Sequence, residues 1–196
     1  MEDQLARDKI SAVVGLFEPY DELEEAHLDD IGSWISSGVE IFRIQKDAVP
    51  PKHLVSYSVV VDSARKKVLL LDHKKALLML PSGGHVDRNE MPFNAAKREL
   101  KEELELSLNP VFYNEGSPFF ATVTETVGIN EKHTDVSLWY LFDGDSTKSL
   151  NQKSEDFVRE FGGYSWLSFD EILSSSVDKF DPHMHRFVRK LEKYLG

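Results

Sequence analysis

The sequence contains no cysteine. This excludes disulfide bonds, thiolate metal sites and cysteine-dependent catalysis. It also lacks long hydrophobic runs, because stretches such as 59–61 and 68–71 have only the length of a strand. The start of the chain, Met1-Glu2-Asp3-Gln4, is acidic and lacks an apolar segment, so we expect no signal peptide. Together these absences favour a cytoplasmic protein with no membrane partner.

Positive charge is also scarce. The chain has 23 Lys and Arg residues against 34 Asp and Glu residues, a net charge of −11. This argues against non-specific binding to nucleic acid, which relies on a basic surface. The negative charge can simply aid solubility. An acidic protein that handles phosphates, however, needs a local cation, and Mg²⁺ would serve.

With 196 residues, 41% of them hydrophobic and 29% charged, the chain can form one well-buried globular domain with additions. Residues 1–46 are expected to form a helical N-terminal extension, because apolar residues recur at helical spacing over 4–16 and 23–35. Pro50-Pro51 marks the junction with a main domain over 47–196. The extension can cover the sheet, form a homodimer contact or close over a substrate.

The main domain has the pattern of an α/β protein. A loop is expected at 82–84, and helices at 92–104, 170–175 and 183–195, with Asp181-Pro182 as the N-cap and first residue of the last helix. Strands are expected at 54–61, 67–72, 77–80, 107–113, 119–127, 136–142 and 161–167.

The helix over 92–104 gathers negative charge on one side. Glu99, Glu102 and Glu103 share an arc of about 100° beside the apolar stripe of the helix. Like charges at these spacings repel each other, and partial burial increases the cost. Hard oxygen ligands on one rigid surface suit Mg²⁺, with Mn²⁺ as an alternative. The competing interpretation is a solvated helix in which Arg98 pairs with Glu102.

The loop before this helix favours the metal interpretation. Gly83 and Gly84 let the backbone approach a ligand closely, so that a carbonyl can complete a metal shell. Glu90 is well placed to hold Arg98 and so to brace the loop against the helix.

These residues resemble the Nudix box of the MutT-like Nudix hydrolase family. Eight of the nine positions match in the family's spacing: Gly84, Glu90, Arg98-Glu99-Leu100, Glu102-Glu103 and Leu106. A chance match in a chain of this length has a probability of roughly one in a million. The departure is Glu105, where the family has a glycine that ends the helix in a left-handed turn. We therefore expect the helix to end otherwise, running on toward Asn109-Pro110.

The resemblance continues on both sides of the box. Residues 80–87 match the family's loop with one residue inserted after Pro81, and residues 166–172 match its final strand and helix. The resemblance implies an α/β/α sandwich around a mixed β-sheet. It also implies Mg²⁺-dependent hydrolysis of a nucleoside diphosphate linked to another group, such as a nucleoside triphosphate, a dinucleotide or a nucleotide sugar.

Motif position also implies roles for individual residues. The metal ligands would be Glu99, Glu102, Glu103 and the Gly83 carbonyl, while Gly84, Glu90 and Arg98 would support the site. A non-catalytic nucleotide-binding or sensor module of the same fold is the alternative, and the complete set of glutamates disfavours it. The isopentenyl diphosphate isomerase branch is disfavoured because its chemistry relies on cysteine.

The general base and the substrate-binding residues are not fixed by the box. In many family members the base comes from a loop ahead of the last strand, which points to Glu160; the other candidates are Glu155, Asp156, Glu125, Glu131 and Asp135. His85 can contact phosphate or be an ordinary loop residue, and metal binding by His183 and His185 is not expected. Aromatic residues can stack on a base, although strand aromatics usually belong to the core: Tyr57, Phe119, Phe120 and Trp139.

Overall fold

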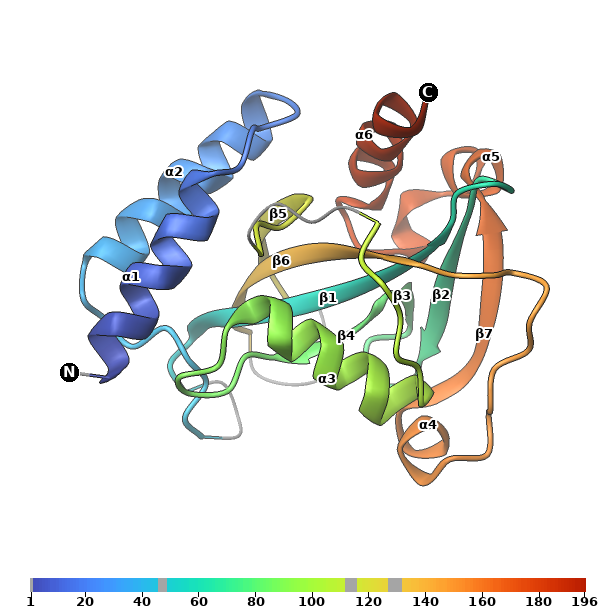
Figure 1. Ribbon diagram of the computed structural model, residues 1–196, viewed down its shortest axis with the longest axis horizontal. Coiled ribbons are helices and arrows are strands. Elements are labelled where there is room, and N and C mark those ends of the chain that lie inside the picture. Colours follow the sequence, from blue (N-terminus) through green and yellow to red (C-terminus); the bar gives the residue numbers. More distant parts are fainter. Residues whose placement is uncertain (1, 46–48, 112–115, 127–131) are drawn as a thin grey trace.

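The computed structural model describes residues 2–45, 49–111, 116–126 and 132–196. Two helices lead into a sheet flanked by further helices (Figure 1). The helices are α1 (Glu2–Gly15), α2 (Glu22–Ser36), α3 (Pro92–Leu104), α4 (Glu155–Glu160), α5 (Phe169–Ser174), the 3₁₀ turn η1 (Val177–Lys179) and α6 (Met184–Leu195). The strands are β1 (Lys52–Asp62), β2 (Lys67–His73), β3 (Leu78–Leu80), β4 (Ser82–His85), β5 (Phe120–Glu125), β6 (Thr134–Asp143) and β7 (Phe161–Ser168).

Within the described residues, seven strands form one mixed sheet. Its main path runs β3-β2-β1-β6-β5, with β4 paired to β1 and β7 paired to β2. β1 and β6 are parallel over their whole length, and the other pairs are antiparallel. β1 therefore lies at the centre of the sheet, where it pairs with β4, the strand before α3, and with β6.

The two faces of the sheet carry different layers of helix. The hydroxyls of Ser56 and Ser58 donate to the carbonyls of Pro92 and Ala96 at 2.7 and 2.6 Å, so these alternate residues of β1 face α3. The intervening residues face the other way, where Val59 packs in a second cluster with α5 and α6. This arrangement confirms the α/β/α sandwich around a mixed sheet (Figure 1).

The N-terminal helices pack onto the main body. Apolar side chains of α1 and α2, including Ile10 and Ile31, belong to the same core cluster as α3. Glu24 in α2 is fully buried: one carboxylate oxygen accepts the Ala121 amide of β5 at 3.1 Å, and the other pairs with Lys190 of α6 at 3.0 Å. The extension thus covers the end of the sheet that carries β5.

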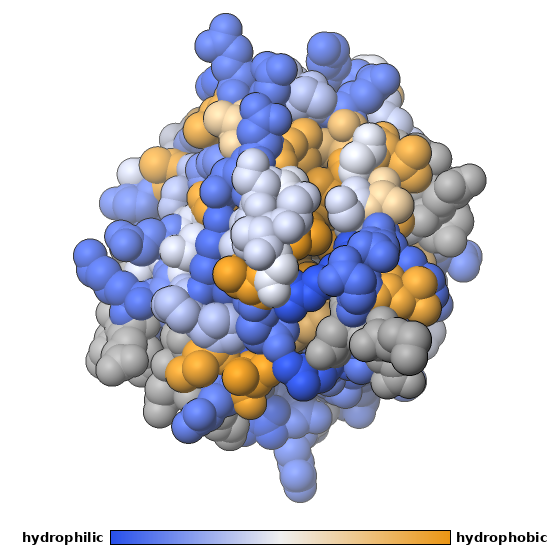
Figure 2. All heavy atoms as spheres, turned by 90° about the vertical axis from the view of Figure 1, so that its left-hand side faces the viewer, coloured by the Kyte–Doolittle hydropathy of each residue, from blue (hydrophilic) through white to orange (hydrophobic). Residues whose placement is uncertain are grey.

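The outer side of this extension is mostly polar. Figure 2 shows hydrophilic residues running across this side of the molecule, with apolar residues in separate patches. Leu5, Leu16 and Leu23 are among the large apolar side chains of α1, α2 and their connection that are exposed.

Two expectations for the strands were wrong. Residues Ser82 to Gly84 do not form a loop but belong to β4, because they pair with Tyr57 and its neighbours in β1. The strand expected at 107–113 is absent from its described part, 107–111, where only Pro110 forms an isolated bridge to Phe142. Proline has no amide to donate, which limits pairing at this position.

Two expectations for the C-terminal helices also need correction. α4 was not anticipated; the Ser154 side chain caps it by accepting from the Phe157 amide. The last helix begins at Met184, one residue after the expected start at His183. Asp181 is not its N-cap, because the Asp181 side chain accepts the His183 amide at 2.8 Å and closes a turn ahead of the helix.

The helix of the Nudix-like box ends where the family pattern would end it. Glu105 has φ 57° and lies in the left-handed region, and the amides of Glu105 and Leu106 both reach the Leu100 carbonyl. The expectation that the helix runs on toward Asn109 was therefore wrong. A residue with a side chain occupies the turn that glycine normally makes.

Candidate metal and catalytic site

Arg98 is the centre of the polar network on α3. Its guanidinium binds both carboxylate oxygens of Glu90, at 3.1 and 2.9 Å, and donates to the His85 carbonyl at 3.0 Å. It also contacts Glu99 at 2.7 Å and Glu102 at 3.3 Å. Its pKa is raised above its usual value, chiefly by the hydrogen bond to Glu90. The structure thus brings together the two residues expected to brace the loop, and Arg98 also compensates two of the three clustered carboxylates.

Both glycines of β4 lie where a side chain would collide. A Cβ on Gly84 would come within 2.3 Å of a Glu99 carboxylate oxygen, and one on Gly83 within 2.4 Å of the Ser56 carbonyl. The backbone of β4 therefore lies directly against the carboxylates of α3. This close approach is the geometry needed for a backbone carbonyl and carboxylates to share a metal ion.

Glu103 is the most deeply placed carboxylate of the cluster. Its side chain accepts the Ser82 hydroxyl at 2.6 Å and the Gly83 amide at 3.2 Å, and the residue is 5% exposed. In the described residues no cationic side chain pairs with it. Burial raises its pKa to about 8, and the negative charges of Glu99 and Glu160 add to this effect, while the Ser82 hydrogen bond opposes it.

The pKa of Glu99 is raised for the same reasons as that of Glu103. Burial raises its pKa, Arg98 works in the opposite direction, and the charges of Glu102 and Glu160 raise it further. Glu102 is more open, with a side chain 53% exposed. A divalent cation among these three carboxylates would offset the free-energy cost of burying their charges and the repulsion between them. This set of donors therefore fits Mg²⁺ or Mn²⁺.

Glu160 lies at the end of α4, which contacts α3 (Figure 1). Its charge reaches both Glu99 and Glu103. Its side chain is 30% exposed and pairs with Arg159 at 2.9 Å. The structure therefore places Glu160 near the cluster on α3, although it lies 57 positions after Glu103 in the chain.

The rival candidates for the base lie in other surroundings. Asp156 pairs with Arg159 at 2.7 Å, Glu155 is exposed at the start of α4, and Glu125 is 69% exposed at the end of β5. Asp135 lies close to three histidines, two of them from other strands. Glu131 lies outside the described residues.

Three of the four aromatic residues considered for base stacking are buried, and the fourth, Tyr57, is half-buried beside them. Phe119, Phe120 and Trp139 are at most 4% exposed and pack with Phe187 of α6, while Tyr57 contacts Trp139 edge-on. Their packing gives the face of the sheet toward α6 its aromatic core.

Two features of the site were not anticipated from the sequence. Ser82, the residue inserted after Pro81, is the hydroxyl donor to Glu103. The second feature is a group of imidazoles and a carboxylate that gathers on the other side of β4: His53, His85, His133 and Asp135. Burial lowers the pKa of His85 to about 3, with help from the positive charge of Arg43.

Comparison with known proteins agrees with this fold. The model of the NUDIX domain family matches residues 52–191. A Nudix-family hydrolase from Clostridium perfringens is similar in structure, with a TM-score of 0.54, 23% identity, and coverage of 72% of this chain and 97% of that one. The Ap4A hydrolase of C. elegans has a TM-score of 0.52 and 18% identity over 73% and 98% of the two chains. No curated protein sequence matches the chain.

The matched region is an α/β/α sandwich with a carboxylate-rich helix against a glycine-containing strand. Because the family model covers residues 52–191, the chain belongs to the Nudix hydrolase family. Among the described residues, every helix is too short or too polar to cross a membrane.

Proposed function

We propose that this protein catalyses Mg²⁺-dependent hydrolysis of a diphosphate linkage in a nucleoside diphosphate joined to another group. The observation that carries this proposal is Glu103, a buried carboxyl beside two further carboxylates and without a paired cation in the described structure. In its ionised form such an arrangement costs free energy unless a cation binds there. Mn²⁺ is the alternative cation, because the donors are all hard oxygens.

Each residue of the site has a role in this proposal. Glu99, Glu102, Glu103 and the Gly83 carbonyl would hold the metal, which supplies charge neutralisation and activation of water when bound. Arg98 and Glu90 fix the loop on the helix, so that the Gly83–Gly84 backbone stays against the carboxylates. Glu160 is proposed as the general base, since it lies near this cluster while remaining partly exposed to water.

The decisive experiment compares wild type with Glu103→Gln. Nucleotide products would be separated by chromatography after incubation with Mg²⁺ and nucleoside triphosphates, dinucleoside polyphosphates or nucleotide sugars. We expect Glu103→Gln to reduce turnover by at least about 100-fold, since even partners of metal ligands are worth about 10- to 100-fold. Glu105→Gln is the matched control, because it removes a neighbouring charge outside the cluster. Equal turnover in Glu103→Gln and wild type, with both proteins folded by circular dichroism, would refute the metal assignment.

The assignment of Glu160 has its own test. A general base that must be ionised gives an acidic limb in the pH–rate profile, and Glu160→Gln should abolish that limb together with most of the turnover. Glu155→Gln, on the same short helix, should leave the profile unchanged. A wild-type profile in Glu160→Gln would remove Glu160 from the mechanism.

The proposal also covers the partners, the compartment and the oligomeric state of the protein. A small nucleotide or related diphosphate is the expected partner, in a cytoplasmic setting without membrane or non-specific nucleic-acid binding. A homodimer is compatible with the exposed leucines of the N-terminal segment, and light scattering would detect it.

A further inference from the structure

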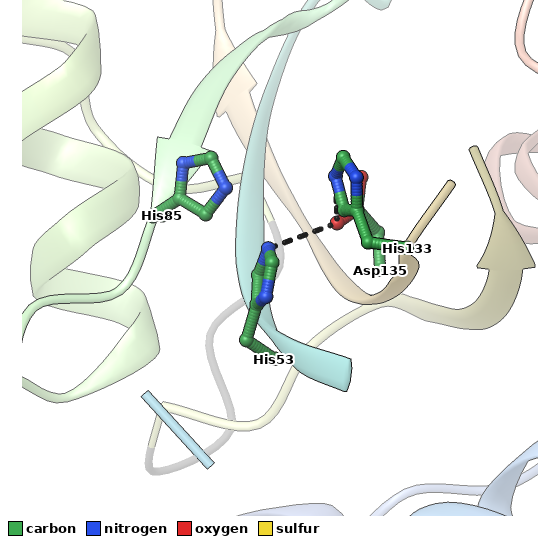
Figure 3. A group of neighbouring side chains, drawn as sticks. All are labelled: His53, His85, His133 and Asp135. Carbon is green, nitrogen blue, oxygen red and sulfur yellow. Dashed lines mark ion pairs between the residues drawn. The ribbon is translucent and has the colours of Figure 1, made fainter. Parts of the chain in front are cut away.

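Three histidines and one aspartate from three strands meet on the face of the sheet away from α3. We call this group the histidine cluster: His53 from β1, His85 from β4, Asp135 from β6 and His133 just before β6 (Figure 3). One candidate ligand atom from each residue lies within 4.8 Å of all the others. None of these side chains is required by the reaction proposed above.

The hydrogen bond made by His53 shows which of its two ring nitrogens carries the proton. Its Nδ1 lies 2.8 Å from the Pro50 carbonyl, which can only accept, so Nδ1 carries the proton. In the neutral ring Nε2 then offers a lone pair. A histidine oriented in this way by a backbone carbonyl is the common arrangement for metal ligands.

The atom facing this lone pair is also an acceptor. The Asp135 Oδ1 atom lies 3.4 Å from His53 Nε2 (Figure 3). Both atoms are buried and have no hydrogen-bond partner among the residues that the structure describes, and the His53 side chain is 0% exposed. Two buried acceptors facing each other are unfavourable unless a second proton on the imidazole or a metal ion lies between them.

A second imidazole approaches the same oxygen. His133 Nε2 lies 3.3 Å from Asp135 Oδ1, while its Nδ1 is 3.1 Å from the Thr126 hydroxyl. Neighbouring ligands around a tetrahedral zinc ion are about 3.3 Å apart when the metal–ligand bonds are about 2.0–2.1 Å. Both separations therefore match the edges of such a site. The ring of His85 lies 4.8 Å from that of His53 and supplies a fourth donor.

From this geometry we propose that the histidine cluster binds one transition-metal ion of the zinc type, with three imidazoles and one carboxylate as ligands. Imidazole donors select Zn²⁺, Co²⁺ or Ni²⁺ over Mg²⁺, which prefers oxygen. The site is separate from the carboxylates of α3, because successive residues of a strand point to opposite faces. Gly84 faces Glu99, whereas the next residue, His85, faces the histidine cluster.

Arg43 makes an anion the competing occupant. Its positive charge acts on His85, and an imidazole with an arginine nearby can also bind phosphate. The carboxylate of Asp135, which faces two of the imidazoles, disfavours an anion and favours a cation. The experiment below distinguishes the two.

The test uses the full chain without a polyhistidine tag and titrates it with Co²⁺. A tetrahedral site should give an intense visible absorption band at one ion per chain, and Zn²⁺ should displace it. Zn²⁺ at about 100 times its Kd should raise the Tm by about 5 to 10 °C. Absence of the band, or a Tm that rises with inorganic phosphate and not with Zn²⁺, would overturn the proposal.

Variants locate the metal. His133→Gln and Asp135→Asn should each lower the affinity for Co²⁺ by at least about 10-fold, whereas His183→Gln, a half-buried histidine elsewhere, should not. Glu103→Gln should keep the Co²⁺ band, since it alters only the carboxylates of α3. Because His53 is wholly buried, its replacement tests folding as much as binding, so the two milder variants decide. Wild-type Co²⁺ affinity in both of them would refute the site.

Discussion

Binding of Mg²⁺ should become tighter as pH rises, because the site must lose a proton from Glu103. Burial raises the pKa of this carboxyl to about 8 in the metal-free protein. A carboxyl must be ionised to bind metal, so each pH unit below the pKa weakens binding up to about tenfold. Between pH 9 and pH 6 the affinity should fall about 100-fold, or about 2.7 kcal/mol.

Calorimetric titration with Mg²⁺ at several pH values measures this directly. Repeating it at pH 7 in two buffers of different ionisation enthalpy should show release of about 0.9 proton per ion bound. Ser82→Ala removes a hydrogen bond that lowers the pKa of Glu103, so it should shift the transition to higher pH. An affinity that is constant from pH 6 to pH 9, without proton release, would refute the reasoning.

The same raised pKa carries a consequence for stability. An acid with a folded-state pKa above its unfolded value of 4.5 stabilises the fold fully below pH 4.5, and this contribution is lost as pH rises through about 8. The metal-free protein should therefore unfold more easily at pH 9 than at pH 6, and Glu103→Gln should reduce this difference. Thermal unfolding in the presence of a chelator would show it.

Three further predictions concern stability, each measured by urea unfolding. Glu24→Ala should cost about 3 to 5 kcal/mol, because it leaves Lys190 and the Ala121 amide without their buried partner; a loss under about 1 kcal/mol would contradict this. Burial works to raise the pKa of Asp62, but hydrogen bonds outweigh it and lower the pKa to about 2. Asp62→Asn should therefore lower the free energy of unfolding by about 2.4 kcal/mol at pH 7. This loss of stability should be present above pH 3.8, should be halved near pH 3 and should disappear as pH falls through about 2. Glu105→Gly should gain about 0.5 to 1 kcal/mol by relieving a left-handed residue, and a loss would show that its side chain stabilises the turn.

The sequence allowed the helix of the Nudix box and its cluster of glutamates to be predicted because both depend on local spacing. α3 spans Pro92–Leu104, and Glu99, Glu102 and Glu103 lie on one side of it. β4 could not be recognised in the same way. Ser82 and the glycines form a strand because β1 offers them partners, and that pairing is a property of the sheet rather than of the segment.

The histidine cluster shows the same limit more clearly. His53 and His85 are 32 positions apart, and they meet because Val55 of β1 pairs with His85 while His53 pairs with Asp135 of β6. A sequence does not state which strands pair or in which register. α4 was missed for another reason, since a helix of six residues is too short to show a period.

The contact between Glu24 of α2 and the Ala121 amide of β5 acts against edge-to-edge pairing of the sheet with other copies of the chain. β5 is the last strand of the main path, and its outer amides would otherwise be free to pair with a strand of another copy. The family match begins only at residue 52, yet a chain shortened to that point would expose the unpaired edge of β5. The second helix therefore occupies the Ala121 amide on this edge, which limits strand pairing between copies but leaves other surfaces open to a homodimer.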